Sequence, residues 1–217
     1  MAKDLAIVLN NGSINSAVVT AMAAQKYRPV MIFADTAPGA TGRMRAAYDQ
    51  QVAHFKPYRE YSVPIAQAGT GPVQNGSTVA DPRQSANISP QLLDLLPLLA
   101  IGIKSAAHHQ AAAIYFGLRV GPSTDELAQA TEFCQIWNEM MQIPCGLGEM
   151  ELLAPLLELE PWQVVDVGFH VVAPFERTWS CLEETSEPCW VCRGCRGREA
   201  AFQQAGKPDP LRIARKS

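Results

Sequence analysis

The stretch that decides the fold is residues 5–26, which read LAIVLNNGSINSAVVTAMAAQK. It opens with Leu5–Leu9, a short apolar run typical of a strand that is buried on both faces of a parallel sheet. The polar turn Asn10–Ser16 follows, and it contains one glycine. The residues from Ala17 to Lys26 then read as a helix. A strand, a polar turn and a helix in this order predict the first unit of an α/β fold.

Strands and helices are expected to alternate along the rest of the chain. A second buried strand is predicted at Val30–Ala34, which ends at Asp35, and an inner strand at Ala111–Phe116. Further strands are predicted at Glu60–Pro64 and Glu151–Leu153. Helices are predicted at Thr41–Phe55, Leu92–His108 and Thr124–Met141, and a short one from Pro161. Because crossovers between parallel strands are right-handed, this order predicts a doubly wound parallel sheet with helices on both faces. Ile65 to Pro90 is rich in Gly, Pro, Ser, Asn and Gln, and we expect a lid or a disordered loop there.

Composition and charge restrict the classes of partner. The 217 residues suit one α/β domain with a small appendage, and the formal net charge is −3. This charge gives no electrostatic reason to expect broad binding to nucleic acid or to membranes. The longest apolar stretch, Leu92–Ile103, contains Asp94 and Pro97 and is too short to span a bilayer. Neither a membrane nor a nucleic acid is therefore expected as a partner.

Four cysteines lie near the C-terminus with the spacing C-x7-C-x2-C-x2-C: Cys181, Cys189, Cys192 and Cys195. Two C-x2-C hooks that share a cysteine, with a fourth thiolate upstream, can close a tetrahedral shell around one zinc ion. Four thiolates leave no open coordination position, so this zinc is expected to be structural. Two disulfides or four unrelated thiols are the alternatives, although neighbouring C-x2-C cysteines pair only with strain.

The cysteine-rich segment also sets the expected domain organisation. No internal repeat or linker divides the chain before it. We expect an α/β domain over residues 1–172 and a zinc-binding module over residues 173–217 that packs on it. The other cysteines, Cys134 and Cys145, lie apart from this module and are expected to stay reduced. Free thiols are typical of a reducing compartment, so a cytoplasmic location is expected.

The turn between the first strand and the first helix is the expected ligand site. In open α/β sheets, ligands bind beyond the carboxyl ends of the strands. Backbone N–H groups and the helix dipole at such a turn favour an anion such as phosphate, and the hydroxyls of Ser13 and Ser16 add donors. An ordinary helix cap, with Asn15 or Ser13 bound to the first-turn amides, is the alternative.

Two parts of the chain resemble a known family. Residues 5–19 resemble the PP-loop of the N-type ATP pyrophosphatases, in which the motif S-G-G-x-D-S follows the first strand, and this chain has NGSINS over residues 11–16 in that frame. The segments Ala173–Cys181, Cys189–Cys195 and Arg198–Gly206 closely resemble the 7-cyano-7-deazaguanine synthases of queuosine biosynthesis. On these residues the chain is identified as a member of that family, with an adenine nucleotide alpha hydrolase-like fold.

The resemblance implies a specific chemistry. Such an enzyme uses ATP to activate the carboxylate of 7-carboxy-7-deazaguanine, forms the amide with ammonia, and dehydrates the amide to the nitrile. The loop would hold the pyrophosphate part of ATP, Mg²⁺ would offset its charge, and zinc would fix the tail to the domain. Family members commonly form homodimers. The resemblance places the ATP or anion site at Asn11, Gly12, Ser13, Asn15 and Ser16. Asp35 is added to this site because it ends the second strand at the sheet edge where a nucleotide would lie, and a turn or cap residue is the alternative.

Several positions depart from the family's pattern. The motif's first serine is Asn11, its second glycine is Ser13, and its aspartate is Asn15. Ser13 has a Cβ where glycine allows a close approach to phosphate, and Asn15 lacks the charge that attracts Mg²⁺. An arginine and an asparagine that usually precede the central helix have become Leu92 and Leu93, which can only pack.

These departures favour a synthase-like, zinc-binding protein with altered or lost ATP-dependent ligase activity on a 7-deazapurine carboxylate. The alternative is a non-catalytic binding module for a nucleobase-like ligand or a protein partner. A third interpretation, nucleic-acid binding by the basic tail, is weaker because a basic solvated face explains the same residues. The sequence assigns no catalytic residue.

Overall fold

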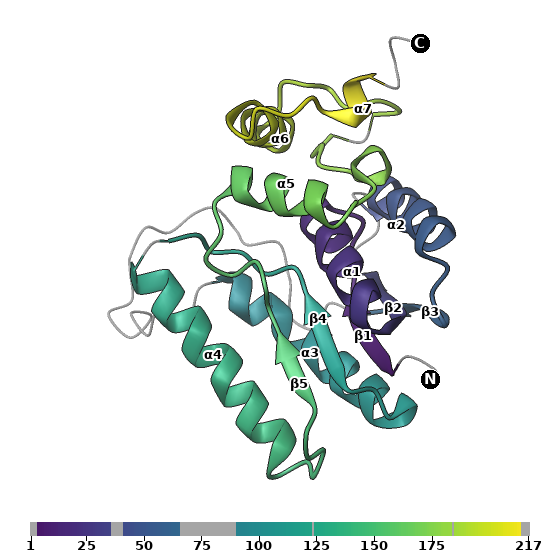
Figure 1. Cartoon of the computed structure of the whole chain (residues 1–217), viewed down its shortest axis with the longest axis vertical. Helices are drawn as coiled ribbons and strands as arrows, with labels where there is room; N and C mark the ends of the chain where they lie inside the picture. Colours follow the sequence, from purple (N-terminus) through teal and green to yellow (C-terminus); the bar gives the residue numbers. More distant parts are fainter. Residues whose placement is uncertain (1–3, 36–40, 66–89, 123, 184, 214–217) are drawn as a thin grey trace, which may run out of the picture.

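A computed structural model describes residues 4–35, 41–65, 90–122, 124–183 and 185–213 of the chain. Its centre is a five-stranded parallel sheet with the strand order β3-β2-β1-β4-β5 (Figure 1). The strands are β1 (Leu5–Leu9), β2 (Arg28–Asp35), β3 (Arg59–Pro64), β4 (Ala113–Phe116) and β5 (Glu151–Leu153). Residues 66–89 of the predicted lid lie outside the described residues.

Helices cover both faces of the sheet. One face carries α1 (Ile14–Lys26), α2 (Thr41–Phe55) and α5 (Pro161–His170), and the other carries α3 (Pro90–His109) and α4 (Thr124–Gln142). Successive strand residues point to opposite faces, so Val8 packs in the cluster with α1 and α5 while Ile7 packs in the cluster with α3 and α4. The predicted doubly wound parallel sheet is confirmed.

The strand order places two turns side by side at the centre of the sheet. β1 pairs with β2 on one side and with β4 on the other, so the chain runs outward to β3 and then returns past β1. This reversal leaves a crevice beyond the carboxyl ends of β1 and β4. Asn10 follows β1 and Gly117 follows β4, and their turns meet at this crevice.

The first helix begins earlier than the sequence predicted. It starts at Ile14 instead of Ala17, and Ser13 is its N-cap residue. The Ser13 hydroxyl oxygen accepts a hydrogen bond from the Ser16 N–H, which satisfies one of the first-turn amides. The capping serine sets the boundary, whereas the apolar run from Ala17 marks only where the helix becomes buried.

The central helix α3 contains both of the leucines, Leu92 and Leu93, that depart from the expected family pattern. Leu92 is 3% exposed and packs in the apolar cluster between α3 and the sheet. Leu92 therefore belongs to the domain's core. Although α3 is rich in leucine, neither it nor any other helix among the described residues is long and apolar enough to cross a membrane.

The C-terminal tail packs over α5, on the face of the sheet that also carries α1 (Figure 1). It contains the 3-10 turn η1 (Phe175–Arg177) and the helices α6 (Arg193–Gln204) and α7 (Pro210–Ile213). Phe175 and Phe202 are each 2% exposed and belong to the same apolar cluster as Val8 of β1. Gly168 of α5 permits this packing, because a Cβ there would lie 2.3 Å from the Phe175 ring. The tail therefore shares part of the domain's core.

Candidate ligand loop and metal centre

The loop between β1 and α1 is closed by hydrogen bonds among its own side chains. The Asn11 side-chain oxygen accepts from the Ser13 N–H at 3.1 Å and from the Ser16 hydroxyl at 2.7 Å. The Ser16 hydroxyl oxygen accepts from the Asn11 N–H at 3.2 Å, and Ser13 Oγ accepts from the Ser16 N–H at 3.3 Å. Backbone N–H groups of the kind that bind anions in such loops are therefore occupied within the loop itself.

Gly12 occupies a position that only glycine fits. Its φ angle is 81°, and a Cβ there would lie 2.2 Å from the Met44 carbonyl oxygen of α2. The Gly12 N–H donates to the Asn10 side-chain oxygen at 2.8 Å, and its carbonyl accepts from the Trp179 N–H at 2.9 Å. The loop is thus pressed between α2 and the tail.

A buried polar network lies beneath the loop. Asn10 Nδ2 donates to Thr20 Oγ1 and to Gln51 Oε1, both at 2.9 Å. Gln51 Nε2 donates to the Arg177 carbonyl in the tail at 3.0 Å, and Gln51 is 0% exposed. Sequence reasoning did not single out these residues. Their only signal is a polar residue at a buried position, and α2 has too weak an apolar periodicity for burial to be inferred there.

Asn15 connects the two central turns. Its Nδ2 donates to the Gly117 carbonyl, which follows β4, at 3.1 Å. The turns are close enough that a Cβ at Gly117 would lie 3.0 Å from the Asn15 Cβ. Of the two residues suggested as helix caps, Ser13 is the cap and Asn15 forms this cross-link.

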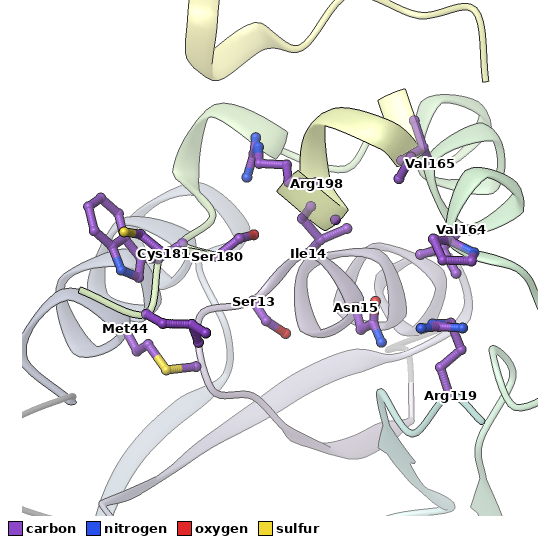
Figure 2. Close-up of a pocket in the computed structure, with 15 residues that line it drawn as sticks. Ser13, Ile14, Asn15, Met44, Arg119, Val164, Val165, Ser180, Cys181 and Arg198 are labelled. Atoms are coloured by element: carbon purple, nitrogen blue, oxygen red, sulfur yellow. The ribbon is translucent and has the colours of Figure 1, made fainter. Parts of the chain in front are cut away.

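A pocket of about 350 Å³ opens between the loop, the start of α5 and the tail (Figure 2). This volume lies at the small end of the range for ligand pockets. Ser13, Asn15 and Ser180 are among its neutral polar residues. None of the described residues that line it is acidic. Its apolar walls include Ile14, Met44, Val164, Val165, Trp179 and Leu182.

Two arginines line this pocket, and they differ in their charge balance. Arg198 is paired with Asp209, with Nε–Oδ2 at 2.7 Å. Arg119 extends from the turn after β4 toward Val164 (Figure 2), and its Nη1 donates to the Leu159 carbonyl at 3.4 Å. No ion pair joins Arg119 to a carboxylate of the described residues. Arg119 is therefore the uncompensated cation of the pocket, and no sequence motif marks it.

The four predicted cysteines come together in the tail. Their sulfur atoms all lie within 4.8 Å of one another, with Cys181–Cys189 at 3.5 Å and Cys181–Cys192 at 3.9 Å. A tetrahedron with metal–sulfur distances of about 2.3 Å has edges of about 3.8 Å, so the spacing fits one metal ion. The six cysteines are free, and a disulfide needs a sulfur–sulfur distance of about 2.05 Å. The alternatives of disulfides and of unrelated thiols are therefore wrong, and the cluster can hold a metal.

Backbone N–H groups lower the pKa of one thiol of this cluster, that of Cys192. The Leu182 and Cys195 N–H groups both donate to Cys192 Sγ at 3.4 Å. These bonds lower the pKa of Cys192 from 9.0 to about 6. Burial raises the pKa of Cys195 to about 12. A bound cation would favour the thiolate form of both, because metal binding displaces the thiol protons.

Arg198 joins three parts of the tail beside this cluster, because it lies in α6 and bonds to residues before and after that helix. Its guanidinium donates to the Asp209 carboxylate through Nε and Nη2, both at 2.7 Å. Nη1 donates to the Thr178 hydroxyl at 2.6 Å, and Nη2 donates to the Phe175 carbonyl at 2.9 Å. Arg198 is 4% exposed and Asp209 is 8% exposed, so the pair is buried and satisfied. Its geometry suits a structural role.

The structure brings five of the predicted anion-site residues together in the loop, namely Asn11, Gly12, Ser13, Asn15 and Ser16. The sixth, Asp35, is the last residue of β2 and pairs in register with Pro64 of β3. It therefore lies at the same edge of the sheet as the loop. Its part in ligand binding stays a prediction.

Comparison with known proteins identifies the family. The family model described as Queuosine biosynthesis protein QueC matches residues 96–206, just over half of the 217 residues. The chain belongs to the QueC family. The matched region runs from α3 to the end of α6 and so includes the cysteine cluster and Arg198. The family that the two ends of the sequence predicted is confirmed.

Curated relatives of the QueC-family chain are 7-cyano-7-deazaguanine synthases. The chain is 36% identical over 117 residues to the synthase of Aliarcobacter butzleri, which covers 52% of this chain and 50% of the relative. It is 25% identical over 224 residues to the synthase of Synechococcus sp. strain CC9902, which covers 96% of this chain and 97% of the relative. The match to the Aliarcobacter butzleri synthase therefore spans about half of that protein, whereas the match to the Synechococcus synthase spans nearly all of it.

A solved structure shares the fold. NMN synthetase from Francisella tularensis matches with a TM-score of 0.50 and 12% identity, covering 95% of this chain and 79% of that one. At this identity the likeness shows the fold alone. The adenine nucleotide alpha hydrolase-like architecture expected for the QueC family is confirmed.

Proposed function

We propose that this QueC-family protein has altered or lost ATP-dependent ligase activity on a 7-deazapurine carboxylate. The observation that carries the proposal is the self-bonded loop. The Asn11 carboxamide, where the motif has serine, accepts the hydrogen bonds of the Ser13 N–H and the Ser16 hydroxyl. A phosphate group would have to displace this carboxamide to obtain the same donors, so binding of the ATP pyrophosphate is weakened.

The charges around the pocket support the same proposal. Mg²⁺ in nucleotide sites is held by one or two carboxylates together with the phosphates, and none of the described pocket-lining residues is acidic. Arg119 supplies one positive charge, and the N-terminus of α1 supplies roughly +0.5 charge more. ATP carries several negative charges, and the described residues of the pocket leave most of them without a partner.

Zinc is the metal that we propose for the tail. Tetrahedral sites with four sulfur ligands hold zinc or an iron–sulfur centre, and the short hooks around Cys189, Cys192 and Cys195 suit a single ion. The bound ion would fix the tail and supply no open coordination position for chemistry. Elemental analysis should give one zinc per chain without visible absorbance. Iron together with acid-labile sulfide would contradict the assignment.

The ligase proposal is tested by AMP formation. Zinc-loaded protein is incubated with ATP, Mg²⁺, ammonium and 7-carboxy-7-deazaguanine, and the nucleotides are separated by chromatography. We expect no substrate-dependent AMP or far less than a family synthase forms under the same conditions. AMP formation at the rate of such a synthase would refute the proposal.

A variant that restores the motif provides the control. The triple change Asn11→Ser, Ser13→Gly and Asn15→Asp removes the internal acceptor and returns the acid. We expect it to bind ATP more tightly than the parent chain, as measured by calorimetry. If its affinity does not rise, the self-bonded loop is not what weakens ATP binding.

The second candidate function is a binding module for a nucleobase-like ligand, favoured by the pocket. Apolar walls with Arg119 as the uncompensated cation suit a flat ring that carries one negative charge. Calorimetry with 7-carboxy-7-deazaguanine tests this. The change Arg119→Leu should weaken binding about tenfold or more, because it removes a charged hydrogen-bond donor. The exposed Arg196 lies outside the pocket, so Arg196→Leu should leave affinity unchanged.

We also propose a cytoplasmic protein that forms homodimers. The six free cysteines support a reducing compartment. The dimer rests on the family resemblance alone. Light scattering of the zinc-loaded protein tests it, because a dimer has the mass of two chains and a mass of one chain would contradict the proposal.

A further inference from the structure

The tail segment 175–181 is held at both of its ends. At one end, Arg198 donates to the Phe175 carbonyl and to the Thr178 hydroxyl. At the other end, Cys181 is a member of the cysteine cluster. The position of this segment therefore depends on a buried ion pair on one side and on the cysteine cluster on the other.

Between these ends the segment contacts the loop by two routes. The first is direct, because the Trp179 N–H donates to the Gly12 carbonyl at 2.9 Å. The second runs through two buried side chains: Gln51 Nε2 donates to the Arg177 carbonyl, and Gln51 Oε1 accepts from Asn10 Nδ2. The Asn10 side-chain oxygen then accepts from the Gly12 N–H. Both routes end at Gly12.

Burial makes the second route sensitive to the position of the tail. Gln51 is 0% exposed and Asn10 is 2% exposed, and no buried side-chain nitrogen or oxygen among the described residues lacks a partner. A displaced Arg177 carbonyl would leave Gln51 Nε2 unpaired in the core, which is costly. The Gln51 side chain would follow the carbonyl, and the Asn10 carboxamide would lose one of its two acceptors, with Thr20 Oγ1 remaining. A movement of the tail is therefore passed to the loop.

We propose that metal occupancy in the tail controls the conformation of the loop, with Gln51 as the positioning residue that links them. With metal bound, Cys181 fixes the segment and the loop stays closed on itself. Without metal, the segment is free at one end, and the hydrogen bonds at Gly12 open more often. The inference goes beyond the proposed function, because it concerns the loop's opening whether or not ATP is used.

Hydrogen exchange measured by mass spectrometry tests the link without any ligand. The zinc-loaded chain and the chelator-treated chain are compared over peptides that contain residues 10–16, residues 177–181 and helix α4. We expect exchange at residues 10–16 to become about tenfold faster after zinc removal, with α4 unchanged, because local opening costs less free energy than global unfolding. Faster exchange confined to residues 177–195 would overturn the proposal.

A matched pair of variants separates the link from general loosening. Gln51→Met keeps the length of the side chain and removes both hydrogen bonds, whereas Gln50→Met makes the same change at the exposed neighbour. With zinc bound, Gln51→Met should speed exchange at residues 10–16 and keep full zinc content, and Gln50→Met should do neither. A Gln51→Met chain with normal loop exchange would refute the role of Gln51. If that variant does not fold, the chelator comparison on the native chain decides.

Discussion

Replacing Arg198 by leucine should destabilise the protein more than any surface change on the same helix. Arg198 and Asp209 are 4% and 8% exposed, and the guanidinium also serves the Thr178 hydroxyl and the Phe175 carbonyl. Leucine would leave the Asp209 carboxylate buried without its cation. The Thr178 hydroxyl and the Phe175 carbonyl would each lose the arginine as a donor at the same time, although the carbonyl would still accept from Thr178.

The magnitude follows from the burial of the pair. Removing one partner of a buried ion pair costs about 3–5 kcal/mol, because the remaining charge is uncompensated. For a chain of this size, each kcal/mol lowers the melting temperature by about 2–4 °C, so we expect a loss of about 6–20 °C. The double change Arg198→Leu with Asp209→Asn should be less damaging than the single change, because it removes the orphaned charge and keeps an acceptor for the Leu211 N–H.

The assay is thermal and urea unfolding of the zinc-loaded chain, followed by circular dichroism. An exposed pair nearby provides the control, since Glu199 of α6 pairs with Arg212 of α7 at 2.8 Å with the side chains 45% and 46% exposed. Glu199→Gln should cost about 0–1 kcal/mol, as exposed pairs do. The reasoning is refuted if Arg198→Leu costs no more than Glu199→Gln, or if the double variant is the least stable of the three.

Three further perturbations probe other parts of the structure. Gly12→Ala should cost about 1–3 kcal/mol in urea unfolding, because φ is 81° and the new Cβ would meet the Met44 carbonyl; Gly42→Ala, where nothing lies within 4 Å, should cost nothing. Equal costs would contradict the close approach. Cys192→Ser should release zinc and loosen the tail, and a variant with full metal content and an unchanged melting temperature would disprove the four-cysteine site. Burial raises the pKa of Tyr48 above its usual 10.0, so its contribution to stability is present below pH 10.0 and is lost as the pH rises above it. Tyr48→Phe should therefore lose stability less steeply at alkaline pH, and an identical decline would contradict this.

The sheet and the cysteine cluster were predictable because their signals are local. The buried strand Leu5–Leu9 and the helix Thr41–Phe55 have the predicted bounds, and the cysteine spacing by itself predicts a metal shell. The predicted start of α1 was wrong because it was taken from the apolar run that begins at Ala17. The true start is set by one capping side chain, Ser13, which precedes that run. Elements and sites are thus predicted best from the sequence where several neighbouring residues indicate the same structure.

The contacts that link parts of the chain were not predictable from the sequence. Asn10 and Gln51 lie 41 residues apart, and Gln51 meets the Arg177 carbonyl 126 residues further on. Nothing in the local sequence of Gln51 indicates that its side chain is buried between the loop and the tail. The same holds for Arg119, whose significance depends on the absence of a nearby carboxylate among the described residues. Both require the tertiary structure.

The hydrogen bonds among Asn11, Ser13 and Ser16 make these residues energetically interdependent. A change of Asn11 alone removes the acceptor of the Ser13 N–H and of the Ser16 hydroxyl, and a change of Ser13 to glycine removes the side-chain cap of α1. Neighbouring changes of this kind are non-additive by about 0.5–3 kcal/mol. Single steps back toward the motif should each remove hydrogen bonds from the loop before any phosphate site exists. The three residues therefore act as one unit, and a working phosphate loop requires that Asn11 and Ser13 change together.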